Sequence, residues 1–216
     1  MALVLLSIRI AALACLVDVA AGLPLAYWLA RTRFPGRRTI EVILMAPLVL
    51  PPTVTGFLLL VVFGNQGLVG RPLRLLTGWS IAFTPAAAVL AAAVVAFPLF
   101  LRTARAAIEA VPEEHVANAR ALGLSPKRAA ARVVLPLASR GLWAGAALAF
   151  GRAFGEFGAT LMLAGNIPGR TQTLSLAVYD AAATGDDALA GGLSIAMLAV
   201  ALAILGMAAL LERRRW

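Results

Sequence analysis

The feature that most constrains this chain is a set of five apolar stretches, each about as long as a bilayer is thick. They cover residues 10–30, 42–63, 81–101, 141–164 and 188–211. Crossing about 30 Å of hydrocarbon takes roughly 20 apolar residues in a helix. We therefore predict an all-α membrane protein with about five transmembrane helices, which together form a single domain over residues 1–216.

The composition agrees with lipid as the main solvent of the chain. Hydrophobic residues make up 62% of the sequence and the mean hydropathy is +0.91, whereas soluble domains are about half apolar. A chain of this length cannot bury so much apolar surface in water. Because no basic residue precedes Arg9, we expect the first stretch to be retained as a span and not cleaved as a signal peptide.

The basic residues fall between the apolar stretches, which favours topology control over nucleic-acid binding. Fourteen Lys and Arg residues lie on one side of the predicted spans, in segments 31–38, 102–140 and 213–215, against four on the other. The positive-inside rule puts the richer side in the cytoplasm. We expect a bacterial-type inner-membrane protein with its N-terminus outside and its C-terminus, with Arg213, Arg214 and Arg215, in the cytoplasm.

The long cytoplasmic connection, residues 102–140, is rich in Ala, Arg and Leu and has one internal break at 123–126. We predict a helix, a turn at Gly123, and a second helix capped by Ser125 with Pro126 at its first position. Pro136 lacks a backbone N–H, so we expect it to interrupt the helix where the chain re-enters the bilayer.

Two prolines inside the second predicted span suggest a pathway for a polar substrate. Pro51 and Pro52 remove backbone donors in mid-span and free carbonyl groups that lipid cannot satisfy. Such a break should face protein or a water-filled cavity, although a kink that serves packing alone is the alternative. The hydroxyls of Thr53 and Thr55 could contact an anion without carrying a full charge.

Three charged residues lie inside predicted spans. Arg152 and Glu156 are four residues apart, so we expect them to share one helix face and to pair with each other. A carboxylate repels an anion, so gating or helix registration suits Glu156 better than direct contact with an anionic substrate. We assign no partner to Asp18.

Several motifs resemble those of a known family. Gly123, nine residues and then Val133-Val134-Leu135-Pro136 resemble the signature of ABC importer permeases. Further stretches are similar to the molybdate permease family, with sulfate and tungstate permeases as near relatives; they cover 50–56, 155–160, 166–169 and 171–173, and the resemblance spans roughly residues 11–211. The family usually begins the signature with Glu six residues before the glycine. Ala117 stands there, so the contact that this glutamate makes in the family is either absent or supplied by Glu113 or Glu114, one turn earlier.

The resemblance implies the fold of a type I ABC importer permease with a cytoplasmic coupling helix. It implies a membrane subunit for an oxyanion, assigned to molybdate, with sulfate and tungstate as alternatives. The implied partners are a second copy of the chain, an extracytoplasmic binding protein, and a separate ATPase that carries ATP and magnesium. The only lysine, Lys127, follows Pro126, so the chain lacks a phosphate-binding loop. We expect no enzymatic activity, no bound cofactor and no metal site.

The resemblance also assigns two groups of site residues. The expected ATPase-coupling residues are Glu113, Glu114, Ala117, Ala119, Gly123, Pro126, Leu135 and Pro136. The expected residues of the translocation pathway or its gate are Pro51, Pro52, Thr53, Thr55, Gly56, Gly155, Glu156, Gly158 and Thr160.

Two other classes of membrane protein fit the sequence less well than an importer subunit. An intramembrane enzyme would need catalytic groups within the spans, and no His, Ser-Lys or paired-carboxylate arrangement occurs there. A secondary transporter built on inverted repeats would show internal sequence symmetry, and none is evident.

The charge asymmetry generates a prediction about topology. A cysteine introduced at Gly169 should react with an impermeant thiol reagent added to intact cells, and one introduced at Lys127 should not. The reverse labelling pattern would overturn the orientation.

Overall fold

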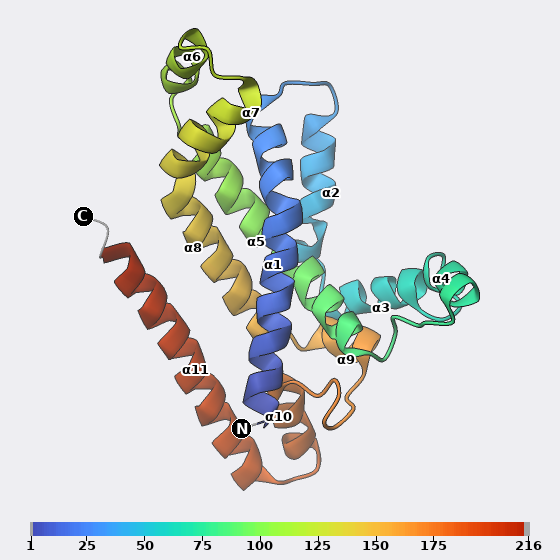
Figure 1. Cartoon of the computed structure of the whole chain (residues 1–216). Helices are drawn as coiled ribbons and strands as arrows, with labels where there is room; N and C mark the ends of the chain where they lie inside the picture. The colour runs from blue at the N-terminus through green and yellow to red at the C-terminus, as the bar shows by residue number, and fades with distance from the viewer. Residues whose placement is uncertain (1, 214–216) are drawn as a thin grey trace.

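The computed structural model describes residues 2–213, and this part of the chain is built from helices without strands. Figure 1 shows the long helices side by side, with a short helical hairpin at one end and an arm that leaves the bundle near its middle. The helices are α1 (Ala2–Arg31), α2 (Arg37–Val49), α3 (Pro52–Phe63), α4 (Gly70–Thr77), α5 (Pro85–Glu109), α6 (Glu113–Ala121), α7 (Pro126–Ala129), α8 (Leu135–Phe154), α9 (Gly158–Ala164), α10 (Leu174–Ala183) and α11 (Asp187–Arg213).

Helix α5 is the centre of the bundle and packs against α1 on one side and α8 on the other. Its buried side chains are mostly alanine, which lets neighbouring backbones approach closely. Gly141 and Gly145 of α8 face it: a Cβ atom at Gly141 would overlap the Cβ of Ala107, and one at Gly145 would lie 3.2 Å from the Cβ of Thr103. Small residues therefore set the spacing of these three helices.

Four helical segments are long and apolar enough to cross a bilayer: α1, α5, the continuous run Pro126–Phe154, and α11 over Asp187–Ile204. Helices α2 and α3 make a fifth candidate, but they meet at a bend of 115°. The total of four to five agrees with the predicted number of spans. Arg214 and Arg215, which the charge count included, lie outside the described residues.

Two of the predicted spans are corrected by the structure. The stretch 42–63 is not one straight helix, because α2 ends at Val49 and α3 begins at Pro52. The stretch 141–164 is also divided: its helix begins earlier, ends at Phe154, and is followed by the separate helix α9. Pro51 and Pro52 at the first break, and Gly155 and Gly158 beside the second, are residues that end or interrupt helices.

The predicted effect of Pro136 is wrong, because the helix runs through it. A π-helical turn, Ala130–Val134, joins α7 to α8, and the N–H of Leu135 donates to the carbonyl oxygen of Ala130. The wider turn changes the backbone pairing just ahead of Pro136, which therefore sits at the start of α8 without breaking the run. The predicted cap is confirmed: the Ser125 hydroxyl accepts from the N–H of Arg128, at 3.4 Å.

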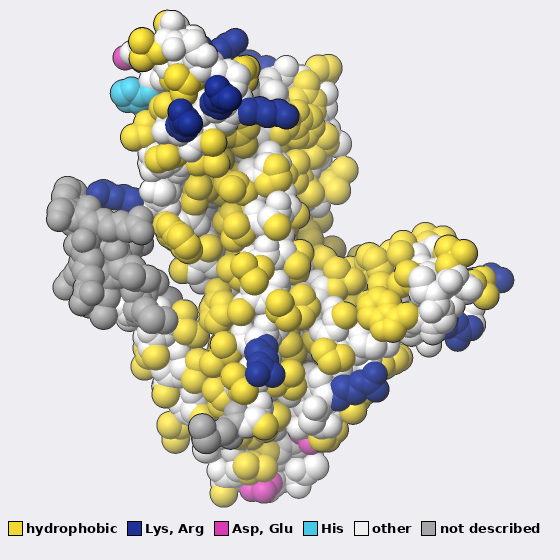
Figure 2. Space-filling view, viewed as in Figure 1, with side chains coloured by type: hydrophobic (Ala, Val, Ile, Leu, Met, Phe, Trp, Pro, Cys, Tyr) yellow, Lys and Arg dark blue, Asp and Glu magenta, His cyan; other side chains and the backbone are white. Residues whose placement is uncertain are grey.

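The surface fits a protein surrounded by lipid. Large hydrophobic side chains are exposed along the long helices, including Trp143 of α8 and Ile195 and Leu198 of α11. Figure 2 shows hydrophobic side chains over most of this face, and several Lys and Arg side chains gathered at the α6–α7 end. Exposed apolar area on this scale marks contact with lipid or with another protein.

The close packing of α5 against α8 generates a prediction about stability. Gly141→Ala should lower the free energy of unfolding by about 1–3 kcal/mol, the usual cost of overpacking, because its Cβ would overlap Ala107. The measurement is the thermal midpoint of the purified protein in detergent.

Gly151→Ala in the same helix is the matched control, because nothing lies within 4 Å of a Cβ atom there. It should keep or raise the midpoint, since alanine favours helix over glycine by up to about 1 kcal/mol. Equal midpoints for the two variants would contradict the packing argument.

Candidate functional site

The bend between α2 and α3 is the first part of the candidate site. At the end of α2, the N–H of Leu50 donates to the carbonyl of Ala46. At the start of α3, the N–H of Thr55 donates to the carbonyl of Pro51. Between them, Leu50 and Pro51 have extended ψ angles of 141° and 135°. Pro51, Pro52 and Thr53 are exposed at this corner. The two prolines thus produce the interruption of the span that the sequence predicted.

The gap between α8 and α9 is the second part. The buried side chain of Glu156 lies in this gap, and its Oε1 accepts from the N–H of Ala159 at 2.7 Å. That contact caps α9 in the way an N-cap residue does. Oε2 lies 2.8 Å from Nη1 of Arg152, an ion pair whose alignment falls short of a hydrogen bond. The predicted Arg152–Glu156 pair is confirmed, but Glu156 lies just beyond the helix that carries Arg152.

The two interruptions pack against each other through α3 and α9. A Cβ atom at Gly158 would lie 3.1 Å from both the Cβ of Pro52 and the backbone nitrogen of Thr53. A Cβ atom at Gly56 would lie 2.6 Å from the Cα of Ala159. Two motifs about a hundred residues apart in the sequence therefore form one junction, and glycine on each side is what permits the contact.

The junction divides the predicted pathway residues into two groups. Thr55 was expected to present its hydroxyl, but it is buried and donates to the carbonyl of Pro51 at 3.4 Å. Within this chain, the threonine exposed at the corner is Thr53. The exposed members of the predicted set are Pro51, Pro52, Thr53 and Gly155, and the buried members are Thr55, Gly56, Glu156, Gly158 and Thr160.

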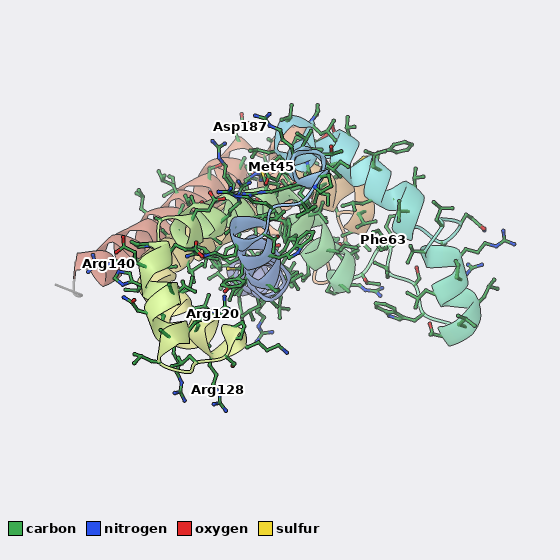
Figure 3. All side chains as sticks on the ribbon, turned by 90° about the horizontal axis from the view of Figure 1, so that it is seen from above. Met45, Phe63, Arg120, Arg128, Arg140 and Asp187 are labelled. Atoms are coloured by element: carbon green, nitrogen blue, oxygen red, sulfur yellow. The ribbon has the colours of Figure 1, made fainter. Side chains whose placement is uncertain are left out.

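The predicted coupling segment forms a helical hairpin at one end of the molecule. Gly123 ends α6 in the left-handed region, with φ of 87°, and the N–H of Leu124 donates to the carbonyl of Ala119, as in a helix-ending Schellman turn. Figure 3 shows Arg120 and Arg128 on this hairpin, with Arg128 at the outer edge of the molecule. The predicted residues here that are exposed are Glu113, Glu114, Ala117, Gly123, Pro126 and Pro136, while Leu135 is half-buried and Ala119 is buried.

Arg31, which sequence reasoning missed, fastens the base of this hairpin. Its Nη1 lies 3.1 Å from Oε2 of Glu113, and its Nη2 donates to the carbonyls of Ile108 and Val111 at 3.0 Å each. Glu113 is thus engaged in an ion pair within the chain, whereas no ion pair of Glu114 is found among the described residues. The one available signal was its position as the first basic residue after the predicted span 10–30, since a basic side chain at a helix C-terminus can bind free carbonyl groups.

Four more charged side chains escaped the sequence reasoning. Arg37 and Glu41 of α2 contact Arg105 and Glu109 of α5 at the same end of the molecule as the hairpin. Opposite charges four residues apart within each helix were a usable signal, but nothing in the sequence paired the two helices.

Neither a metal site nor a partner for Asp18 emerges from the part of the chain that the structure describes. No group of three or more His, Cys, Asp or Glu residues there could hold a metal ion. Both carboxylate oxygens of Asp18 are buried in α1 without a hydrogen-bond partner among the described residues.

The capped junction generates a prediction about the Arg152–Glu156 pair. Arg152→Gln should leave a buried carboxylate unpaired and lower the free energy of unfolding by about 3 kcal/mol. Arg152→Gln combined with Glu156→Gln should recover most of that loss, because glutamine still accepts from Ala159 and carries no charge. Thermal midpoints of the three purified proteins test this. A double variant no more stable than Arg152→Gln alone would contradict it.

Comparison with known proteins finds extensive similarity. The sequence model of the family described as "binding-protein-dependent transport system inner membrane component" matches residues 22–216. The putative molybdenum transport system permease YvgM of Bacillus subtilis is 42% identical over 187 residues, which is 87% of this chain and 82% of the relative. The molybdenum transport system permease ModB of Escherichia coli is 42% identical over 200 residues, 92% of this chain and 87% of the relative.

Solved structures show the same fold. The inward-facing MetNI methionine ABC transporter superposes with a TM-score of 0.76 at 19% identity, over 97% of this chain and 92% of the matched chain. A bacterial alginate ABC transporter, in complex with its alginate-bound periplasmic protein, gives 0.79 at 16% identity, over 99% and 78%. These likenesses confirm the predicted importer-permease fold, and at such identity they bear on the fold alone.

Proposed function

We infer the function from the family to which the chain belongs, the binding-protein-dependent transport system inner membrane components. The chain is a multi-pass permease subunit of an ABC importer, and not an enzyme. We propose molybdate as the transported oxyanion. The observation that carries this proposal is 42% identity to molybdenum permeases over most of the chain. Sulfate and tungstate are oxyanions of the same charge and remain the alternatives.

The α3–α9 junction supports a pathway at this point of the chain. Lipid cannot satisfy an interrupted backbone, so the exposed corner at Pro51, Pro52 and Thr53 belongs beside protein or water. Helix α3 begins there without a side-chain cap, so its first N–H groups and the hydroxyl of Thr53 are the polar donors that an anion could use. Glu156 already caps α9, so its carboxylate is held away from a passing anion by its own contacts.

We propose that residues 1–216 act as one permease domain and that a second copy supplies the other wall of the pathway. Figure 1 shows the arm of α3 and α4 projecting from the bundle. Its exposed apolar side chains, such as Phe57, Leu75 and Leu76, and the exposed corner are surfaces that one copy leaves uncovered. The buried residues Gly56, Gly158 and Thr160 would then hold the wall together, and the exposed ones would face the substrate.

The other proposed partners are a separate ATPase, which binds ATP and magnesium, and an extracytoplasmic binding protein. The ATPase should dock on the α6–α7 hairpin, whose exposed surface combines Leu122, 84% exposed, with Glu114 and the basic residues Arg120, Lys127 and Arg128. We place this hairpin in the cytoplasm and the N-terminus outside, on the strength of the charge asymmetry. In Figure 1 the hairpin and the N-terminus lie at opposite ends of the molecule.

Reconstitution tests the substrate. Proteoliposomes that contain the permease, its ATPase and its binding protein should hydrolyse ATP faster when molybdate is added outside, and should accumulate it. Sulfate and tungstate, added singly at the same concentration, serve as comparisons. Stimulation by sulfate and not by molybdate would overturn the assignment of the anion, and stimulation by none of the three would overturn the proposed function.

Gly123→Val tests the docking role of the hairpin. Valine at positive φ costs roughly 1 kcal/mol or more, so the turn should distort while the spans still insert. We expect normal membrane levels with weak co-purification of the ATPase. Gly185→Val is the matched control, because Gly185 also has a positive φ, 80°, with nothing within 4 Å of its Cβ position, but lies in the turn after α10. Equal loss of ATPase from both variants, or from neither, would contradict the docking role.

A further inference from the structure

Helix α2 makes little apolar contact with the core of the bundle. None of its thirteen residues is buried, and only Leu44 and Met45 pack partly against the core. At its charged end, a cavity of about 360 Å³ lies between α2 and α5, and it is lined by Glu41, Arg105 and Glu109 as well as by the apolar residues Leu29, Met45, Leu101 and Ala106. Apolar packing therefore does little to fix the position of α2 against its neighbour.

A closed ring of four charges bridges the two helices instead. Within α2, Arg37 lies 2.8 Å from Glu41, and within α5, Arg105 lies 2.9 Å from Glu109. Across the helices, Arg37 lies 2.7 Å from Glu109 and Arg105 lies 2.6 Å from Glu41. Each side chain thus has two partners of opposite sign, and the charges alternate around the ring.

The ring lies next to the hairpin that we propose as the ATPase dock. Glu109 is the last residue of α5, and Glu113 is the first residue of α6. Arg31 ties this corner together, because it contacts the carbonyls of Ile108 and Val111 as well as the carboxylate of Glu113. A displacement of α6 should therefore move the end of α5 as well, and with it Glu109, the last residue of α5.

The other end of α2 is the bend at Leu50 and Pro51. A helix that is clamped at one end, unburied along its length and interrupted at the other can turn as a unit about the interruption. Motion of its charged end would then change the angle at which α2 meets α3, and so the position of Pro51, Pro52 and Thr53.

We propose that the ring of Arg37, Glu41, Arg105 and Glu109 links the ATPase-docking hairpin to the α2–α3 bend, and that these four are positioning residues for transport. The proposal rests on the proposed function, since it assumes that an ATPase moves the hairpin. None of the four residues touches the substrate. They act on transport through the position of α2. That position depends on opposite charges facing each other across the two helices, Arg37 opposite Glu109 and Arg105 opposite Glu41.

Charge inversion tests this dependence without altering composition. Arg37→Glu with Glu41→Arg keeps the pair within α2 but sets Glu against Glu109 and Arg against Arg105. Arg105→Glu with Glu109→Arg does the same from α5. The quadruple variant combines all four changes and restores an alternating ring of inverted polarity. The net charge and the spacing within each helix are the same in all three variants.

Each variant is purified with its ATPase and reconstituted, and three quantities are measured: ATPase retained, molybdate taken up per ATP hydrolysed, and the effect of nucleotide on labelling of Thr53→Cys. The labelling uses a background in which the single native cysteine, Cys15, is replaced by serine. It reports movement at the bend whatever the substrate is, so the link can be measured even if molybdate is the wrong anion.

We expect the two half-inverted variants to retain the ATPase but to lose about tenfold in uptake per ATP, within the range of ordinary coupling free energies. Their labelling at position 53 should no longer respond to nucleotide, and the quadruple variant should recover both properties.

Wild-type coupling in the half-inverted variants would overturn the proposal. A quadruple variant that does not recover coupling would overturn it too. The same holds if uptake falls only in proportion to the amount of folded protein. If wild-type assemblies transport none of the three oxyanions yet labelling follows these expectations, the proposed function fails and the link stands.

Discussion

The structure depends on a constraint that lipid imposes: every backbone polar group inside the bilayer needs a partner from protein or from trapped water. Two of the apolar stretches are interrupted, at Pro51–Pro52 and at Gly155–Phe157, and each alone would leave backbone groups without partners. The chain places the two interruptions together, with α3 on α9 and with Glu156 as the cap of α9. An irregular backbone is thereby supported by protein at the place where a polar substrate would need a path.

The rest of the bundle supports that junction by close packing of small residues. The small side chains of alanine-rich α5 let α1 and α8 pack close to it. Gly141 and Gly145 of α8 permit the close contact between α8 and α5. Van der Waals contact between small residues is the main source of helix association in lipid, where no hydrophobic effect favours it. Among the described residues, the ion pairs between helices lie at one end, where Arg31 and the ring of four charges join α1, α2, α5 and α6.

The sequence was sufficient for the properties that depend on local chemistry. Apolar length predicted the number of spans, the Pro51–Pro52 pair predicted an interruption, and Ser125-Pro126 predicted a helix start with its cap. It failed where the outcome depends on contacts between distant segments. Thr55 is buried on the helix that packs against α9, and Glu156 lies just beyond its helix, after Gly155. The ring of charges could not be predicted because periodicity within one helix says nothing about which helix faces it.

The π-helical turn ahead of Pro136 has a consequence for how the two halves of the Pro126–Phe154 run are oriented. Such a turn is equivalent to one residue inserted into an α-helix, and each residue of an α-helix turns the chain by about 100°. Every side chain after Val134 therefore points about a quarter of a turn or more away from where uninterrupted α-helical winding would put it. That phase shift sets how the α6–α7 hairpin is rotated relative to the face of α8 that meets α5, the face that carries Gly141 and Gly145. The five residues Ala130–Val134 set the register between the α6–α7 hairpin and the membrane bundle.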